Sequence, residues 1–179
     1  LRERFGLDSL LGSGPAMTRI LEQAHLASES RLGICLVGEA GSGREHTARA
    51  IHYASPGGAQ SFVPLDSHRL PPAEQAEIIG RILELTHSST AEVLQPGTLF
   101  LAEVDQLPRD IQQQLLDLLE TTTQATPTQP LRLMVSSTRP LEQAVADEDL
   151  LPEFHYRISA ITIGVPPLRD RTSDFQPLA

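Results

Sequence analysis

The sequence contains no lysine, so all 14 of its lysine-or-arginine residues are arginines. Chemistry that needs a lysine amine, on a phosphate or in a Schiff base, is therefore excluded from this chain. A single cysteine, Cys35, excludes an internal disulfide and fits a reducing compartment. No apolar run approaches the roughly 20 residues of a membrane-spanning helix, and residues 1–10 lack the pattern of a signal peptide. We therefore expect a cytoplasmic protein with no membrane partner.

Positive charge is scarce as well. The formal net charge is −9 and the isoelectric point is about 5.1, which argues against a nucleic-acid surface because phosphate backbones attract basic patches. The content of 40% hydrophobic and 21% charged residues is typical of a folded globular domain. At 179 residues the chain has the size of one domain with a substantial core.

Short apolar segments alternate with amphipathic segments along the chain. Strands buried on both faces are expected over 32–37, 61–66, 98–104, 131–136 and 160–165. Helices are expected over 14–30, 45–53, 72–87, from Pro108 onward and over 141–146, with an exposed loop over 121–130. Pro64 disfavours a fully paired central position for the second strand. The alternation predicts a three-layer α/β fold, with helices on both faces of a parallel sheet.

A glycine-rich segment lies between the first strand and the next helix, where a phosphate-binding loop belongs. It consists of Gly38, Glu39, Ala40, Gly41, Ser42, Gly43, Arg44 and Glu45. Glycines let successive N–H groups converge on phosphate oxygens, and the helix N-terminus adds a favourable dipole. Such loops normally carry a lysine at the position of Arg44. A strand–turn–helix needs glycines for its turn alone, so this segment by itself leaves both interpretations open.

Further motifs occur in a fixed order along nearly the whole chain. They are LGSGPAM (11–17), GEAGSGRE (38–45), ARAIH (48–52), PGTLFLAEV (96–104), LP (107–108), YRI (156–158) and PPLRDR (166–171). In this order they resemble the central AAA+ domain of sigma-54-dependent transcriptional activators, the bacterial enhancer-binding proteins. The resemblance implies a P-loop ATPase core that assembles into a ring and uses ATP to remodel RNA polymerase carrying the alternative sigma factor.

The same resemblance sets the expected domain organisation. In the family the core sits between an N-terminal regulatory domain and a C-terminal helix-turn-helix, so DNA contact is expected only through a domain outside this chain. Residues 1–179 are expected to form a single AAA+ α/β subdomain of a longer regulator, without the helical lid that begins in the family at about the point where this chain ends. Self-association into an oligomer is expected for the full-length protein.

The chain departs from the family at the nucleotide site. Arg44 replaces the phosphate-loop lysine, and its wide planar guanidinium is not equivalent to a compact ammonium. Ala102 occupies the position of the aspartate that helps to hold Mg²⁺, whereas Glu103 matches the carboxylate that polarises the attacking water. Asp66 and Thr138 stand at positions that carry asparagine in the family.

Two further departures concern neighbouring subunits and the sigma factor. Of the two trans-acting arginines of the family only Arg157 is kept, because the other position is Leu151. The GAFTGA signature of the sigma-contacting loop is missing from the segment that follows Gly80. Contact with sigma-54 is therefore doubtful, and Glu103 and Arg157 are the catalytic candidates that remain.

Several residues also have plain structural interpretations. A glutamate such as Glu103 can be a solvated strand end, although the carboxyl ends of parallel strands favour a site position. Asp105 is expected to cap a helix or form a turn. Surface or packing roles are expected for His46 and His52, and Cys35 is expected to be an inert buried side chain. A solvated charged turn explains residues 169–171 as well as the family motif does.

The sequence therefore predicts a degenerate sigma-54-activator-like domain. We expect weak binding of ATP or ADP, with ADP bound at least as well as ATP, and no ATP hydrolysis. No metal-ligating cluster is predicted, and Mg²⁺ binding is left open. One alternative is an active ATPase in which Asp66 or Asp105 holds Mg²⁺. The other is a nucleotide-free scaffold that keeps the fold for oligomer contacts.

Overall fold

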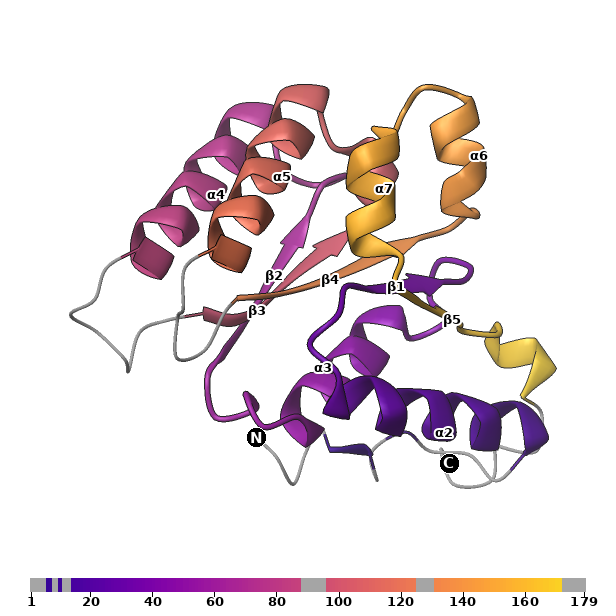
Figure 1. Cartoon of the computed structure of the whole chain (residues 1–179). Helices are drawn as coiled ribbons and strands as arrows, with labels where there is room; N and C mark the ends of the chain where they lie inside the picture. Colours follow the sequence, from indigo (N-terminus) through magenta and orange to yellow (C-terminus); the bar gives the residue numbers. More distant parts are fainter. Residues whose placement is uncertain (1–5, 8–9, 11–13, 88–95, 125–130, 172–179) are drawn as a thin grey trace.

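The computed structural model describes residues 6–7, 10, 14–87, 96–124 and 131–171. These residues form a parallel five-stranded sheet in the order β2-β3-β4-β1-β5 (Figure 1). The strands are β1 (Ile34–Val37), β2 (Ser61–Asp66), β3 (Pro96–Ala102), β4 (Arg132–Ser137) and β5 (Ile161–Gly164). The predicted parallel sheet is confirmed. β2 lies at an edge of the sheet. Pro64, which lacks an N–H group to donate, is tolerated there because an edge strand pairs on one side only.

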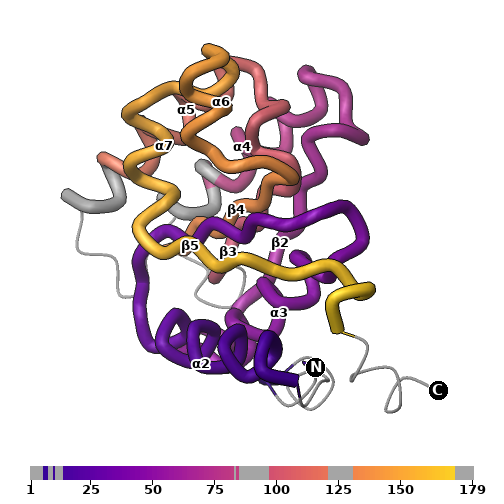
Figure 2. Tube along the Cα trace, turned by 90° about the vertical axis from the view of Figure 1, so that its right-hand side faces the viewer, coloured from indigo at the N-terminus to yellow at the C-terminus, as the bar shows by residue number. Residues whose placement is uncertain are grey.

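Helices cover both faces of the sheet, which confirms the predicted three layers (Figures 1 and 2). One face carries α2 (Pro15–Glu29) and α3 (Arg44–Ala54). The other carries α4 (Pro72–His87), α5 (Arg109–Gln124), α6 (Leu141–Ala146) and α7 (Pro152–Ile158). Two short 3₁₀ turns, η2 (Val104–Gln106) and η3 (Leu168–Asp170), follow β3 and β5.

Side chains of each strand alternate between two hydrophobic cores, one on each face of the sheet. Ile34 and Leu36 of β1 pack with α2 and α3, whereas Cys35 between them joins the core under α4 to α7. Phe100 and Leu101 of β3 divide in the same way, and all five side chains are at most 1% exposed. Burial on both faces explains why these strands are apolar runs rather than alternating sequences.

Some expected boundaries are wrong. The third strand ends at Ala102, so Glu103 and Val104 lie beyond it. Helix α5 continues to Gln124, so the first four residues of the predicted loop over 121–130 are helical, and the rest lie outside the described residues. Helix α7 was not predicted, although Pro152 stands in its favoured first turn. Its short apolar face gave too weak a periodic signal.

Packing roles predicted for two buried side chains are confirmed. Burial raises the pKa of the Cys35 thiol to about 12, so it stays protonated and inert. His52 is fully buried between α3 and the sheet, with Nδ1 2.8 Å from Thr98 Oγ1 and Nε2 3.1 Å from the Gln60 carbonyl oxygen. That carbonyl can only accept, so Nε2 carries the proton and donates.

The buried His52 makes stability sensitive to acid. Burial lowers its pKa below the ordinary value of 6.5, so the unfolded chain binds a proton that the folded chain resists. The free energy of unfolding should therefore fall as pH drops below that value, by at most about 1.4 kcal/mol per pH unit. Chemical denaturation between pH 7.5 and 5 measures this. His52→Gln should flatten the profile, and the exposed-site control His68→Gln should leave it unchanged.

Candidate functional site

The glycine-rich loop lies at the carboxyl edge of the sheet, between β1 and α3. The ends of β3 and β4 reach the same edge, because Leu36 and Val37 of β1 pair with Ser136 and Ser137 of β4, and β3 lies next to β4. Ligands of open parallel sheets bind outside this edge. The site predicted from the sequence is thus assembled from the loop and from residues that follow β3 and β4.

Three glycines shape the loop. Gly41 and Gly43 have φ angles of 78° and 93°, which side-chain-bearing residues rarely adopt. A Cβ atom at Gly38 would lie 2.3 Å from the carbonyl oxygen of Val165. The α3 helix then begins at Arg44, and Thr47 in its first turn bonds to the Gly43 carbonyl oxygen through its N–H at 2.9 Å and its Oγ1 at 3.1 Å. Anion-binding nests at helix N-termini have backbone of this kind.

Arg44 extends across the site to the carboxylate of Glu103. Its Nη2 lies 2.5 Å from Glu103 Oε1, and the two side chains are 10% and 22% exposed. Nη1 of the same guanidinium is buried and has no hydrogen-bond partner among the described residues. The same holds for Ser42 Oγ in the loop. The structure therefore brings the phosphate-loop and acidic candidates together as a charge-assisted pair.

Glu103 follows β3 in a left-handed conformation, with φ 53° and ψ 57°. This conformation is uncommon for a residue with a side chain and is a form of backbone strain that clusters at functional sites. It sends the chain into η2 and leaves Ala102, with its methyl group, at the end of the strand. The predicted strand therefore ends before Glu103. Glu103 still lies beside the glycine loop, because its carboxylate contacts Arg44.

Asp105 lies in the η2 turn, which confirms its predicted place in a turn, and its side chain also belongs to an ion-pair network. Its side chain is 3% exposed and accepts from Ser137 Oγ at 3.1 Å and from Arg139 Nε at 2.8 Å. Arg139 also bonds to Asp147 at 2.7 Å and Asp149 at 2.5 Å. The sequence offered no signal for this network, which joins residues 8 to 34 positions apart.

Both carboxylates proposed for an alternative magnesium site already bond to other residues of the chain. Asp105 is held by Ser137 and Arg139, and Asp66 accepts from Arg69 Nε and the His68 N–H, both at 3.0 Å. Within the described ranges no cluster of three or more histidine, cysteine, aspartate or glutamate side chains could hold a metal ion. The active-ATPase alternative thus finds no support in the positions of these two aspartates.

The segment after β5 fastens onto the glycine loop. Arg169 binds Glu39 through two parallel contacts of 2.6 Å, which lower the pKa of that carboxyl group. Arg171 donates to the carbonyl oxygens of Ser42 at 2.7 Å and Pro166 at 2.6 Å. Residues 168–170 thus form an exposed turn, as one interpretation expected, and Arg169 and Arg171 also bind the glycine loop. Glu39 and Arg169 are exposed, so their pair positions the segment more than it stabilises the fold.

Arg157 lies apart from the loop, on α7. Its guanidinium is 41% exposed and 4.0 Å from Glu120 of α5. No contact among the described residues joins it to the pair of Arg44 and Glu103, so a role in trans stays a prediction. Tyr156 beside it is 82% exposed.

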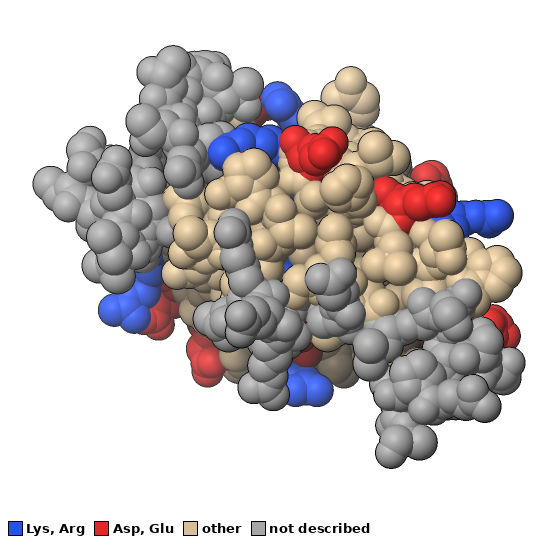
Figure 3. Space-filling model, turned by 90° about the horizontal axis from the view of Figure 1, so that it is seen from below, with Lys and Arg blue, Asp and Glu red and all other residues tan. Residues whose placement is uncertain are grey.

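The described surface shows no continuous basic patch on the face formed by α2 and α3. Charged side chains there are few and of both signs (Figure 3). The overall composition of the chain is acidic, with a formal net charge of −9. None of the described helices has both the length and the apolar character needed to cross a membrane.

The parallel sheet, the glycine loop between β1 and α3, and the carboxylate after β3 define a domain of the P-loop NTPase class. The chain belongs to the sigma-54 interaction domain family, whose sequence model matches residues 11–168. It is 30% identical to the Nif-specific regulatory protein of Herbaspirillum seropedicae over 97% of this chain and 34% of that protein. It is 28% identical to the transcriptional regulatory protein GlrR of Escherichia coli, over 96% of this chain and 42% of that one.

Solved structures show the same fold. NtrX from Brucella abortus, crystallised in complex with ADP, superposes with a TM-score of 0.74 at 24% identity, over 94% of this chain and 40% of that one. The P-loop NTPase domain of the sigma-54 transport activator from E. coli gives 0.67 at 23% identity, over 88% and 99%. The chain spans about a third of the length of the curated relatives it matches.

Proposed function

We propose that this chain is a nucleotide-binding but non-hydrolysing AAA+ domain of a sigma-54-activator-like transcriptional regulator. The 2.5 Å pair between Arg44 and Glu103 carries the proposal. Glu103 stands where the family's water-polarising carboxylate is expected. A carboxylate that accepts a charge-assisted bond from a guanidinium is a poorer base and a poorer acceptor for a water proton.

Two further positions weaken hydrolysis. Ala102, at the end of β3, offers no side-chain oxygen to a metal ion. Leu151 offers no charge at one of the two positions where the family has a trans-acting arginine. Each lost charge contact to a transferring phosphoryl group costs several kcal/mol of transition-state stabilisation, about 10³-fold or more in rate for an arginine finger.

Nucleotide binding is supported by polar atoms that the loop leaves without partners. Arg44 Nη1 and Ser42 Oγ are buried and unbonded within the described structure, and both belong to the glycine loop. Buried donors of this kind cost free energy unless a ligand satisfies them. The loop and these donors suit a phosphate group, whose negatively charged oxygens can accept their hydrogen bonds. NtrX from B. abortus has been crystallised with ADP and with ATP.

Calorimetric titration with ADP and ATP tests the proposal. We expect weak binding, with ADP at least as tight as ATP because the third phosphate adds charge near Glu103, and little effect of Mg²⁺. Arg44→Lys should tighten binding severalfold, since a compact ammonium leaves more room for phosphate oxygens. Arg81→Lys, on an exposed arginine of α4, is the matched control. If neither the wild type nor Arg44→Lys binds nucleotide, the domain is a scaffold.

We propose that the full-length protein self-associates, is cytoplasmic and contacts DNA through a domain outside this chain. The chain's coverage of its relatives leaves most of their length for such domains. Residues 88–95, within the shortened sigma-contacting segment, lie outside the described residues. The prediction that the chain does not contact sigma-54 therefore rests on the sequence alone.

Because the sigma-contacting signature is missing, we predict no stable complex with sigma-54. The measurement is co-elution of this chain and purified sigma-54 factor in the presence of ADP and a transition-state analogue of phosphate. A relative that carries the signature serves as positive control. A complex formed by this chain would contradict the prediction and revive the activator interpretation.

A further inference from the structure

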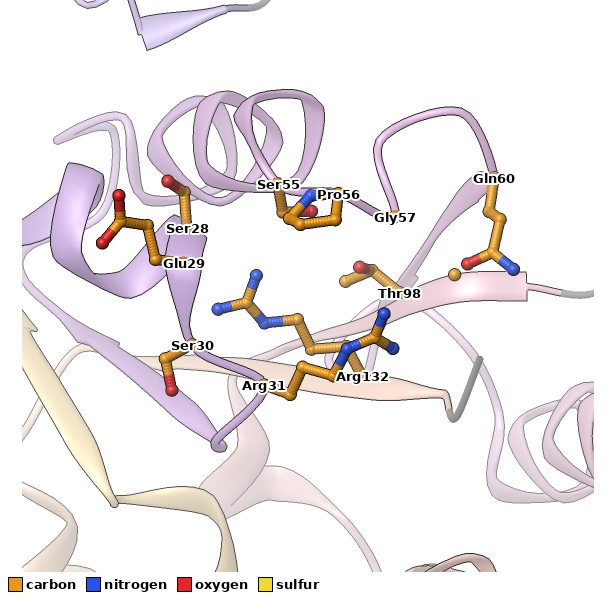
Figure 4. Close-up of a pocket in the computed structure, with 11 residues that line it drawn as sticks. Ser28, Glu29, Ser30, Arg31, Ser55, Pro56, Gly57, Gln60, Thr98 and Arg132 are labelled. Carbon is orange, nitrogen blue, oxygen red and sulfur yellow. The ribbon is translucent and has the colours of Figure 1, made fainter. Parts of the chain in front are cut away.

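A polar cavity lies at the opposite end of the strands from the glycine loop. It has a volume of about 40 Å³ and is bounded by the C-terminal ends of α2 and α3 and by the start of β3 and β4 (Figure 4). The lining residues that carry charge are Glu29, Arg31 and Arg132. A space of this size admits a water-sized or slightly larger group, such as the oxygens of a small ligand.

Arg132 is the most unusual of these residues, because it is a charged side chain only 6% exposed. One of its terminal nitrogens donates to the carbonyl oxygen of Ala27, near the end of α2. Its Nε is buried and has no partner in the described structure. Burial, followed by the nearby Arg31 charge, lowers the pKa of Arg132 to about 10. A buried cation with an unmet donor is costly unless something satisfies it.

Arg31 adds a second guanidinium at the same cavity. The two arginine side chains cross beside it, one directed toward α2 and the other toward Thr98 (Figure 4). No ion pair joins either guanidinium to a carboxylate among the described residues. Glu29 points away from both in Figure 4, is 69% exposed and lies 3.8 Å from His25. Two like charges therefore meet here with no carboxylate partner among the described residues, and the carbonyl end of α2 offsets the charge of Arg132 only in part.

Three hydroxyl groups around the cavity are already bonded to other atoms of the chain. Ser28 and Ser55 donate to the carbonyl oxygens of His25 and His52, both at 2.7 Å. Thr98 donates to His52 Nδ1, because the proton of that imidazole lies on Nε2. The two guanidinium groups are the cavity's strong donors, and a guanidinium matches the planar or tetrahedral oxygens of an oxyanion.

We propose that Arg31 and Arg132 form a binding site for a small oxyanion, the phosphate or carboxylate group of a ligand. The ligand enters past the exposed Arg31 and binds between the two guanidinium groups that line the cavity. The site is separate from the glycine loop and does not depend on nucleotide binding there.

Nuclear magnetic resonance on ¹⁵N-labelled protein tests the proposal at the atoms concerned. Inorganic phosphate is titrated at constant ionic strength while the Nε–H signal of Arg132 is followed. We expect a saturable shift, and a loss of apparent affinity of at least about tenfold in Arg31→Glu, because a carboxylate at the rim repels the anion. Arg81→Glu, on the outer helix layer of the opposite face, should leave the titration unchanged. The backbone amides of Gly41 and Gly43 report separately on phosphate at the glycine loop.

Parallel titrations with acetate and chloride identify the ligand chemistry. A saturable response to acetate at lower concentration than to phosphate assigns a carboxylate ligand, and the reverse order assigns a phosphate ligand. The proposal is overturned if the Arg132 signal does not move with either oxyanion. An equal response to chloride, or an unchanged titration in Arg31→Glu, overturns it as well.

Discussion

Replacement of Arg139 by methionine is expected to lower the free energy of unfolding by about 3 kcal/mol. The reason is Asp105, whose side chain is 3% exposed and would keep Ser137 as its main partner. Removing one member of a buried pair leaves an uncompensated charge, which is far more costly than losing the pair as a whole. Methionine retains much of the apolar stem of arginine, so the loss reports on the charge. Urea denaturation measures the effect.

A double variant separates this account from a general packing defect. Arg139→Met combined with Asp105→Asn removes the buried charge together with its partner, so it should be more stable than the sum of the single effects predicts, by at least about 1 kcal/mol. Arg109→Met is the control, because its guanidinium is 58% exposed. It should cost no more than about 1 kcal/mol. Additive single effects would show that Asp105 and Arg139 do not act as a pair.

Replacement of Glu103 by glutamine is expected to tighten ADP and ATP binding about tenfold, or 1.4 kcal/mol. In the wild type a phosphate group must share Arg44 with the Glu103 carboxylate and must approach a like charge. Glutamine keeps the size and a weak acceptor but removes the charge. Calorimetric titration of both proteins at one ionic strength measures the change.

The control for this prediction is Glu45→Gln, in the same loop. Glu45 bonds to Arg49 one helical turn away and is 51% exposed, so it offers little obstacle to the phosphate position. Its affinity change should stay within about twofold. If Glu45→Gln tightens binding as much as Glu103→Gln does, the effect is one of net charge and not of the pair with Arg44.

The sheet and most of its helices were predictable because their signals are local. Runs such as Leu99 to Leu101 are apolar at every position. This pattern is typical of a strand that is covered on both faces of the sheet. Pro64 even indicated an edge strand, and β2 is one. Helix α7 escaped prediction because seven residues give barely two turns, too few for a periodic pattern.

The contacts of the site were not predictable, because they join residues far apart in the chain. Arg44 and Glu103 are 59 positions apart, and Arg169 and Glu39 are 130 apart. The glycine pattern indicated the loop, and the family resemblance together with the strand-end position indicated Glu103, but neither carries information on which side chains are in contact. The ion pair of Asp105 was missed for the same reason, because its partner Arg139 lies 34 positions further along the chain.

Phosphate release from ATP tests the central claim most directly. The wild-type chain and Glu103→Gln are assayed side by side with and without Mg²⁺, at nucleotide concentrations above the affinity found by calorimetry. The account predicts that both proteins release phosphate no faster than buffer alone, because Glu103 is held by Arg44 and Ala102 supplies no metal ligand. Magnesium-dependent release by the wild type that disappears in Glu103→Gln would contradict it and establish an active ATPase.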